Sequence, residues 1–260
     1  MTHYPLTKKQ IEHFAKDGFL IVKNLLSREE VAMYQNIYED FLSGKIDATK
    51  FRSDLGSHAT EPNKASKELI TQIMIPGRLF PKLLDMPIHQ RSLAIAKQLI
   101  GEDMALDFDM LIDKAPNTNT PTPWHQDRAY WITMPDTRSA SCWVALDKAI
   151  IDNGCMWYVP GSHVLPVRPH NPAGKGGGAL QCEANENEAV AAEILPGDCV
   201  FHHGGTLHYS RGNSTMLRRR AFITNFRPQA MIDYERSQGY DHTGKREVRD
   251  NLAQSTLPTV

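Results

Sequence analysis

The stretch Leu195–Phe222, LPGDCVFHHGGTLHYSRGNSTMLRRRAF, alternates short runs of β-forming residues with Gly, Pro, Asn and Ser at the turns. Similar segments lie upstream at 104–114 (MALDFDMLIDK), 140–150 (ASCWVALDKAI) and 154–163 (GCMWYVPGSH), and RRAFITNF at 219–226 ends the series. Short strands that follow one another closely, with turn residues between them, are typical of an all-β sandwich or barrel. The sequence therefore predicts a mainly β core in this part of the chain.

Helical additions to this core are expected in the first third of the chain. Two capping boxes, Thr7–Gln10 and Ser27–Glu30, predict helix starts, because each places a hydroxyl three residues before Gln or Glu. A third helix is expected from Pro87 to Ile100, where a glycine follows as a stop signal. Between the first two helices, FLIVKNLL at 19–26 predicts a strand. The polar residues 44–68 predict a loop.

We expect one domain over residues 1–260, since the sequence contains no internal repeat and no compositional break. Its expected parts are a mostly helical N-terminal part at 1–104, the β core at 105–230 and a C-terminal extension at 231–260. Residues 171–193, with their GKGGGA run, interrupt the strand pattern. A loop of this length within a β domain is usually functional, so this segment is a candidate lid over a site.

The composition is typical of a soluble globular protein, with 41% hydrophobic residues, 23% charged residues and a net charge of −1. Acidic and basic residues are mixed along the chain, which argues against a nucleic-acid partner. No apolar run reaches the length of about 18 residues that spans a bilayer, and MTHYPLTKKQ lacks the apolar core of a signal peptide. We therefore expect no membrane partner and a cytoplasmic location. The sequence does not indicate an oligomeric state. Reduced cysteines without a CxxC pair agree with a reducing compartment: Cys142, Cys155, Cys182 and Cys199.

A candidate metal site lies in TPWHQDRAYW at 122–131, where His125 and Asp127 are two residues apart. Side chains on a strand have a period of two, so both would project from one face. Two imidazoles and a carboxylate on one face of an octahedron form the facial triad of non-haem Fe(II) oxygenases, whereas zinc with similar ligands would be nearly tetrahedral. Ligand types alone leave both metals open. The third ligand must come from a distant segment, and the candidates are His163, His170, His202, His203 and His208.

An arginine favours the oxygenase over the zinc alternative. Arg219 follows His208 by eleven residues and begins the last strong strand pattern. An arginine buried in a β core needs an anionic partner, and a small dicarboxylate held by iron at one end would supply a carboxylate at the other. Arginine pairs with carboxylates in a bidentate manner. Alternation along the strand leaves open whether Arg218, Arg219 or Arg220 is the inward one.

Nearly the whole chain resembles the phytanoyl-CoA dioxygenase family of Fe(II)/2-oxoglutarate-dependent oxygenases. The resemblance begins with KDGFLIVKNLLSREEV at 16–31 and continues with MLIDKAPNTNTPTPWHQD at 110–127. It extends through CWVALDKAIIDNGCMWYVPGSH at 142–163 and PGDCVFHHGGTLHYSRGNS at 196–214, and it closes with RRA at 219–221. The ordered combination of these segments is specific, although the His-x-Asp pattern alone is not.

The resemblance implies a double-stranded β-helix core of the jelly-roll, cupin-like type, flanked by N-terminal helices. It also implies an enzyme that binds Fe(II), consumes 2-oxoglutarate and O2 as co-substrates, and uses ascorbate as a reductant. His125, Asp127 and His208 resemble the family's iron ligands and catalytic centre, and Arg219 resembles the residue that anchors the far carboxylate of 2-oxoglutarate. Further residues that resemble the co-substrate pocket of the family are Ser210, Trp143 and Met110.

The resemblance also bears on the reaction. Halogenating relatives replace the metal carboxylate with a small residue, so the presence of Asp127 favours hydroxylation of a C–H bond with release of succinate and CO2. We expect a small-molecule substrate, whose identity the sequence leaves open. Arg128, Tyr130 and Trp131 are candidate substrate contacts, although a surface charge and ordinary packing would also explain them. Two alternatives are a 2-oxoglutarate-independent cupin-like metalloenzyme and a non-catalytic binding module.

Overall fold

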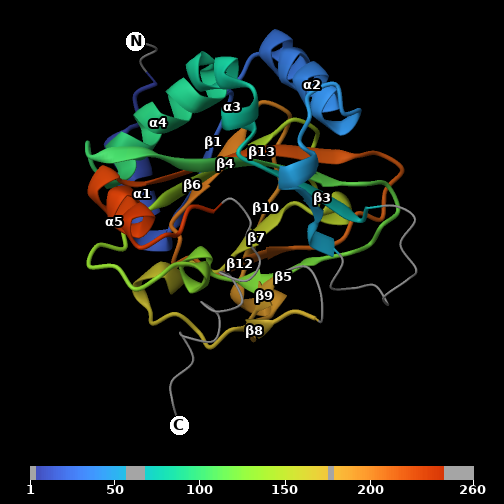
Figure 1. Ribbon diagram of the computed structural model, residues 1–260. Helices are drawn as coiled ribbons and strands as arrows, with labels where there is room; N and C mark the ends of the chain where they lie inside the picture. Colours follow the sequence, from blue (N-terminus) through green and yellow to red (C-terminus); the bar gives the residue numbers. More distant parts are fainter. Residues whose placement is uncertain (1–3, 57–67, 175–178, 243–260) are drawn as a thin grey trace.

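The computed structural model describes residues 4–56, 68–174 and 179–242, and its β-strands form a jelly roll with two facing sheets (Figure 1). The large sheet has the strand order β1-β11-β6-β13-β4-β3-β2, and the small sheet has the order β10-β7-β12-β5. The strands of the large sheet are β1 Phe19–Val22, β2 Arg52–Asp54, β3 Ile70–Met74, β4 Met104–Lys114, β6 Ala140–Ala145, β11 Cys199–His202 and β13 Arg219–Pro228. Those of the small sheet are β5 Thr122–His125, β7 Met156–Tyr158, β10 Val190–Ala192 and β12 His208–Ser210.

Connections along the chain produce the jelly roll. The chain passes from β4 in the large sheet to β5 in the small one, returns to β6, crosses to β7, and later repeats the crossing through β11, β12 and β13. All pairings within both sheets are antiparallel. Ligand sites in such barrels lie between the two sheets, where alternate residues of each strand point inward. The expected mainly β, jelly-roll fold is confirmed.

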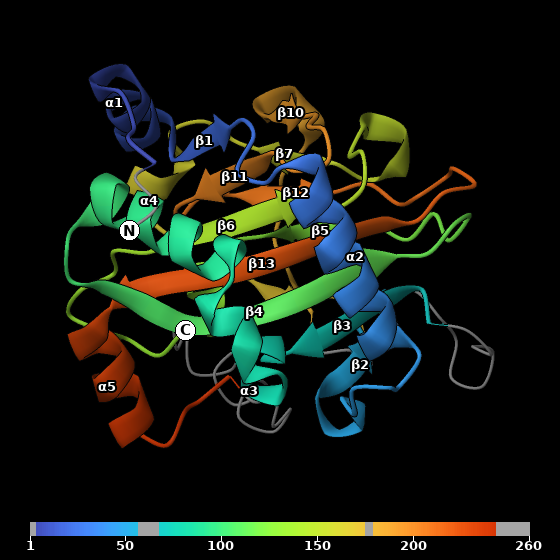
Figure 2. The ribbon, with the colours of Figure 1, turned by 90° about the horizontal axis from the view of Figure 1, so that it is seen from above.

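Helices cover the outer face of the large sheet (Figure 2). They are α1 Lys8–Asp17, α2 Arg28–Leu42, α3 Pro76–Leu79 and α4 Pro87–Ile100, and α5 Gln229–Ser237 follows the last strand. Aromatic side chains of α2, including Tyr34 and Tyr38, pack with Phe222 and Phe226 of β13 in one buried cluster. Alternate residues of the same strand, Ala221 and Ile223, belong to a second cluster between the sheets. The period of two in β13 thus separates a helix-packing face from a face that is available for a site.

Both predicted capping boxes are present, at Thr7 and Ser27, and the helix predicted from Pro87 to Ile100 has those bounds. Gly18 ends α1 in the left-handed region at φ 77°, and a Cβ there would lie 2.4 Å from the ring of His163. Only glycine fits this position without strain, and it turns the chain directly into β1.

Two predicted loops contain strands, so those predictions were partly wrong. Within 44–68, β2 and a 3-10 turn at Thr49–Phe51 precede residues 57–67, which lie outside the described residues. Within 171–193, the pairs β8 Asn171–Pro172 and β9 Leu180–Gln181 form a small ribbon and β10 joins the small sheet; residues 175–178 lie outside the described residues. Strands of two or three residues are too short to produce a readable period, and their existence depends on pairing with distant partners.

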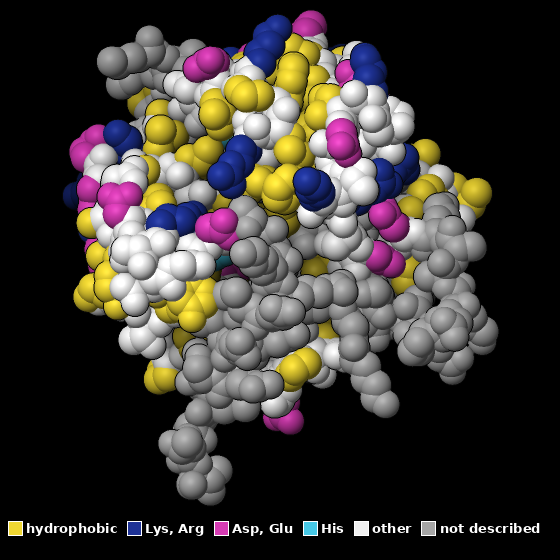
Figure 3. Space-filling view, viewed as in Figure 1, with side chains coloured by type: hydrophobic (Ala, Val, Ile, Leu, Met, Phe, Trp, Pro, Cys, Tyr) yellow, Lys and Arg dark blue, Asp and Glu magenta, His cyan; other side chains and the backbone are white. Residues whose placement is uncertain are grey.

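The N-terminal third is integrated into the core, because β1, β2 and β3 all belong to the large sheet. This integration supports the single domain that we propose for residues 1–260. None of the described helices combines the length and the apolar composition required to cross a bilayer. Acidic and basic side chains are interspersed over the face that carries α2 and α4 (Figure 3).

Candidate active site

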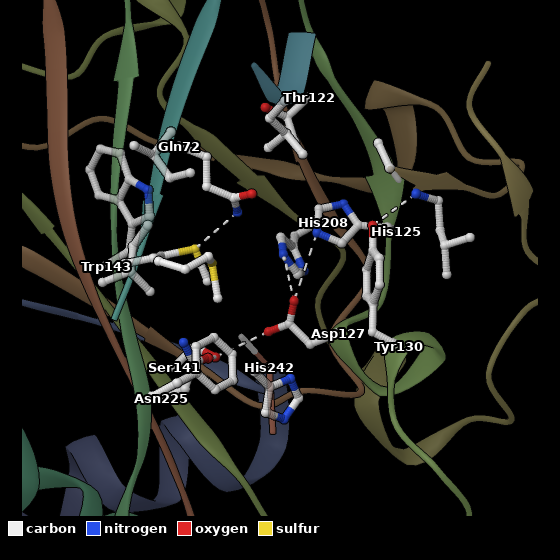
Figure 4. Close-up of a pocket in the computed structure, with 18 of the residues that line it drawn as sticks. Gln72, Thr122, His125, Asp127, Tyr130, Ser141, Trp143, His208, Asn225 and His242 are labelled. Atoms are coloured by element: carbon white, nitrogen blue, oxygen red, sulfur yellow. Dashed lines mark hydrogen bonds and ion pairs between the residues drawn. The ribbon is translucent and has the colours of Figure 1, made fainter. Parts of the chain in front are cut away.

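Three of the predicted ligands converge between the two sheets. His125 ends β5 and lies opposite His208 of the neighbouring strand β12. Asp127 Oδ1 lies 3.7 Å from Nε2 of His125 and 3.6 Å from Nε2 of His208. Gln126 keeps an extended backbone, with φ −123° and ψ 130°, so the period of two continues beyond the strand and brings Asp127 to the side of His125. One potential ligand atom from each of the three residues lies within 4.8 Å of the other two (Figure 4).

Backbone carbonyls orient both imidazoles for metal binding. Nδ1 of His125 lies 2.7 Å from the carbonyl oxygen of Pro123, and Nδ1 of His208 lies 2.8 Å from that of Thr206. A carbonyl only accepts, so each Nδ1 carries the hydrogen and each Nε2 directs a lone pair toward Asp127. Burial lowers the pKa of both histidines, which favours the neutral rings that a metal requires.

The carboxylate of Asp127 is ionised despite its burial. Burial raises the pKa of this carboxyl. The neighbouring His208, a hydrogen bond from His202 and the nearby His125 together lower the pKa by more than burial raises it, so the net shift is downward. Its second oxygen, Oδ2, lies 3.0 Å from Oγ of Ser141 and 3.2 Å from Nε2 of His202. The site therefore offers one anionic and two neutral ligands.

The other candidate histidines have different surroundings. Nε2 of His202 lies 3.2 Å from the second oxygen of Asp127, and His202 is not part of the three-residue group that could hold a metal, so it acts as a supporting group. The rings of His163 and His203 lie together, 5.4 Å between centroids, and burial lowers the pKa of His203 to about 4. His170 accepts the backbone N–H of Gln126 through Nε2.

Arg219 is the inward arginine, which answers the question of register. Arg218 pairs with Asp113 and Arg220 pairs with Asp147, both through short contacts between charged groups. Arg219 lies between them in sequence and is 1% exposed. The alternation of β13 thus sends the outer two arginines to carboxylates and the middle one into the space between the sheets.

Two nitrogens of the Arg219 guanidinium lack a hydrogen-bond partner among the described residues. Its Nε and Nη1 are buried and have no hydrogen-bond acceptor, and its Cζ lies 5.1 Å from the centre of the Trp143 ring. Burial lowers its pKa to about 10, so it remains charged at neutral pH. A buried cation with unused N–H groups is a binding site for an anion.

A cavity of about 230 Å³ is lined both by the three candidate metal ligands and by Arg219. The strand register aligns the residues on the floor of this cavity in rows that cross β4, β13 and β6. Ile223 of β13 lies opposite Met110 and Trp143, and the next inward residue, Asn225, lies opposite Phe108 and Ser141. Arg219 lies at one end of these rows. Polar or aromatic residues that also line the cavity are Gln72, Thr122, Tyr130, Trp131, Ser210 and His242.

The sequence profile of the phytanoyl-CoA dioxygenase (PhyH) family matches residues 14–221. The chain belongs to this family. A curated member, "Phytanoyl-CoA dioxygenase, peroxisomal" from Bos taurus, is 24% identical over 230 residues, which cover 85% of this chain and 68% of the relative.

Solved structures are similar to this chain over most of its length. EvdO2 from Micromonospora carbonacea var. aurantiaca, complexed with 2-oxoglutarate, is 30% identical with a TM-score of 0.68, covering 85% of this chain and 91% of EvdO2. SnoK, described as a non-heme alpha ketoglutarate dependent carbocyclase from nogalamycin biosynthesis, is 21% identical with a TM-score of 0.66, covering 85% of this chain and 83% of SnoK. The likeness to SnoK shows the fold alone.

The predicted substrate contacts of this family member divide into two groups. Tyr130 and Trp131 line the cavity, and Tyr130 accepts a hydrogen bond of 2.8 Å from the backbone N–H of Leu180 in β9. Arg128 is not among the residues that line the cavity, and its assignment as a substrate contact stays a prediction. A 3-10 turn, Asp127–Tyr130, begins at Asp127 and ends the strand alternation there. Arg128, the next residue, therefore does not continue the row of His125 and Asp127.

Sequence reasoning missed a second charged cluster at the edge of the cavity. Asp107, Glu235 and His242 offer atoms close enough for a metal, but Arg227 and Arg236 already contact both carboxylates. The charges of the two guanidiniums balance those of the two carboxylates, so this is an ion-pair network that fixes α5 to β4 and β13. A strand-and-helix pattern gives no signal for such pairing between distant segments.

Gln72 was also missed. It lies on β3, in a region without a predicted strand, and its Nε2 lies 3.6 Å from Sδ of Met110 on the neighbouring strand β4. Ser141 and Asn225 were missed because their importance depends on contacts across strands, which sequence spacing does not reveal.

Proposed function

We propose that the protein is an Fe(II)- and 2-oxoglutarate-dependent dioxygenase that hydroxylates a C–H bond of a small molecule. His125, Asp127 and His208 would hold the iron. Two neutral imidazoles and one carboxylate on one side of the cavity fit Fe(II), which prefers this ligand set and keeps further positions for co-substrates. When bound, iron and 2-oxoglutarate together supply oxidation by O2 with release of succinate and CO2, and ascorbate would maintain the ferrous state.

The observation that carries this proposal is the buried guanidinium of Arg219, which lines the same cavity as the three ligands and whose Nε and Nη1 have no hydrogen-bond partner among the described residues. A metal site alone would not need it. Arg219 would bind the far carboxylate of 2-oxoglutarate, next to the buried hydroxyl of Ser210, while Trp143 and Met110 form the apolar wall beside it. The 2-oxoglutarate complex of EvdO2, which is 30% identical, supports this co-substrate.

Residues of the chain prepare the site for chemistry. Carbonyls of Pro123 and Thr206 hold the two imidazoles in the tautomer that exposes Nε2. Burial of the cavity floor excludes water around Arg219, which strengthens its attraction for a carboxylate. Tyr130 and Trp131, which line the same cavity as the three candidate metal ligands, would position the substrate.

A small substrate fits the dimensions of the site, because co-substrate and substrate must share a cavity of about 230 Å³. Hydroxylation is preferred to halogenation, since Asp127 keeps the carboxylate in the ligand set. A carbocyclase among the structures that share the fold shows that other oxidations are compatible with it, so the product must be identified. We retain the cytoplasm as the expected location.

The test is succinate formation from 2-oxoglutarate with Fe(II), ascorbate and a panel of metabolites. We expect His125→Ala and Asp127→Ala to lose both metal and succinate formation while keeping the wild-type melting temperature. Arg219→Met should retain the metal and lose turnover at low 2-oxoglutarate. A purified protein that contains zinc and forms no succinate would favour the 2-oxoglutarate-independent metalloenzyme. Tight 2-oxoglutarate binding without O2 consumption would favour a non-catalytic module.

A further inference from the structure

A polar row of three side chains crosses the large sheet directly beneath Asp127. In the strand register, His202 of β11 lies opposite Ser141 of β6, and Ser141 lies opposite Asn225 of β13. All three side chains are at most 5% exposed. Figure 4 shows Ser141 and Asn225 on the side of Asp127 that faces away from His125 and His208.

The two oxygens of Asp127 have different surroundings. Oδ1 faces Nε2 of His125 and Nε2 of His208, at 3.7 and 3.6 Å. Oδ2 instead lies 3.0 Å from Oγ of Ser141 and 3.2 Å from Nε2 of His202. One oxygen is thus directed to the ligands of the small sheet, and the other is held by the large sheet.

The hydroxyl of Ser141 has one hydrogen but two neighbouring oxygens. Its Oγ lies 3.0 Å from Oδ2 of Asp127 and 2.5 Å from Oδ1 of Asn225, while Nδ2 of Asn225 is buried without a partner. Amide oxygen and nitrogen are assigned from the hydrogen-bond network. Turning the amide resolves the conflict: Asn225 then donates to Ser141, and Ser141 donates to the charged carboxylate, which is the stronger acceptor.

We propose that Ser141, Asn225 and His202 are positioning residues that hold Oδ2 of Asp127 away from the metal, so that the carboxylate binds through Oδ1 alone. This inference rests on the proposed metal site and extends it. A carboxylate that bound through both oxygens would occupy a position that a co-substrate needs. Ser141 and His202 act on Asp127 directly, whereas Asn225 acts through Ser141. Mutation of a residue that hydrogen-bonds to a metal-ligating carboxylate commonly weakens metal affinity by about 10- to 100-fold.

The first measurement is the dissociation constant for Co(II), titrated into metal-free protein and followed by the visible absorption of the bound ion. We expect Ser141→Ala and His202→Leu each to weaken binding by about tenfold and to alter the Co(II) spectrum, because a released carboxylate changes the coordination. A merely structural role would leave the spectrum of bound Co(II) unchanged.

Thr224→Val is the matched control. Thr224 precedes Asn225, is fully buried, and donates to Ser92 of α4 on the opposite face of the sheet. This variant removes a buried hydroxyl from the same strand without touching Asp127. Its Co(II) affinity and spectrum should equal those of the wild type, and its melting temperature shows how much a lost hydroxyl alone destabilises the sheet.

A double-mutant cycle tests the order of the contacts. Asn225→Leu should weaken Co(II) binding by less than Ser141→Ala, and the double variant should be no weaker than Ser141→Ala, because Asn225 acts only through Ser141. Additive losses would overturn the relay. Unchanged Co(II) affinity and spectrum in Ser141→Ala and His202→Leu would overturn the positioning role.

His125→Ala separates this inference from the proposed function. If it abolishes Co(II) binding while Ser141→Ala and His202→Leu bind normally, the metal site holds and only the positioning role fails. If His125→Ala still binds Co(II) as the wild type does, the metal site itself is wrong, and the positioning role fails with it.

Discussion

Arg219 and Arg227 lie on the same inward face of β13, yet they have opposite surroundings. Both are 1% exposed, and each guanidinium lies over an indole ring, at 5.1 Å from Trp143 and 5.0 Å from Trp131. Arg227 contacts two buried carboxylates, whereas Arg219 has unused N–H groups and no carboxylate within ion-pair distance among the described residues. Equal burial thus conceals two functions: one arginine is a structural cation and the other is prepared for a ligand.

The largest expected effect is the loss of stability in Arg227→Met. Removing this guanidinium leaves the buried carboxylates of Asp107 and Glu235 with only one of their two arginine partners. Breaking a buried ion pair in this way costs about 3–5 kcal/mol. Denaturant unfolding measures it. Arg219→Met is the control and should change the unfolding free energy by less than about 1 kcal/mol, because no carboxylate loses a partner. Equal destabilisation by the two variants would remove the distinction between them.

The reverse contrast is expected for the co-substrate. Arg219→Met should raise the KM for 2-oxoglutarate by about 100-fold, or about 2.8 kcal/mol at 1.4 kcal/mol per tenfold change, in the range of a hydrogen-bonded charge pair. Succinate formation at varied 2-oxoglutarate measures this. Co(II) affinity should remain unchanged. A normal KM would show that another group binds the far carboxylate.

A finer version of the comparison uses Arg219→Lys. The positive charge remains, but lysine lacks the planar fork that pairs with both carboxylate oxygens. We expect a KM for 2-oxoglutarate about tenfold above the wild type, between those of the wild type and Arg219→Met. A value equal to that of Arg219→Met would mean that geometry, rather than charge, determines binding.

The smallest expected effect is a pH dependence of stability at the Arg227 end. Burial lowers the pKa of His242. The hydrogen bonds to Asp107 and Glu235 raise the pKa by more than burial lowers it, so the net shift is upward from 6.5. Arg227, whose Nη2 lies 3.1 Å from the same ring nitrogen, opposes this shift. A raised folded-state pKa gives stability that is complete below pH 6.5 and is lost as the pH rises through the folded value.

His242→Gln should therefore flatten the stability profile between pH 6 and pH 9, measured by denaturant unfolding at each pH. The same variant should not alter the KM for 2-oxoglutarate, because His242 stacks on Phe108, which lies opposite Asn225, six residues along β13 from Arg219. A wild-type profile without a decline above pH 6.5 would contradict the assignment.

The comparison of Arg219 with Arg227 also shows which parts of the fold and of the site could be predicted from the sequence. Local signals were sufficient where one segment decides its own structure: β4 has the predicted bounds 104–114, and both capping boxes begin helices. The convergence of His125, Asp127 and His208 was also expected, because strand alternation and the family resemblance agreed. Arg227 was not anticipated, since its partners come from another strand and from α5.

Other misses have the same physical origin. β2 and β3 exist because they extend the large sheet, and three-residue strands such as β2 have no measurable periodicity. The 3-10 turn that begins at Asp127 was not anticipated, because no local residue signals it. Pairing between distant segments, rather than local propensity, determines these features.

The pairing of β1 with β11 joins two segments that are far apart in the sequence, with Phe19 opposite His202 and stacked on Tyr158 at 5.0 Å between ring centroids. During synthesis, β1 leaves the ribosome long before its partner exists and must wait with an open edge. The strands that carry His202 and His208 are made much later than β1, since β11 begins at Cys199, 180 residues after Phe19 begins β1. Iron binding at the proposed site would therefore have to wait until β12 is made, and a product that stopped before β11 would lack His208 and leave β1 unpaired and prone to aggregate.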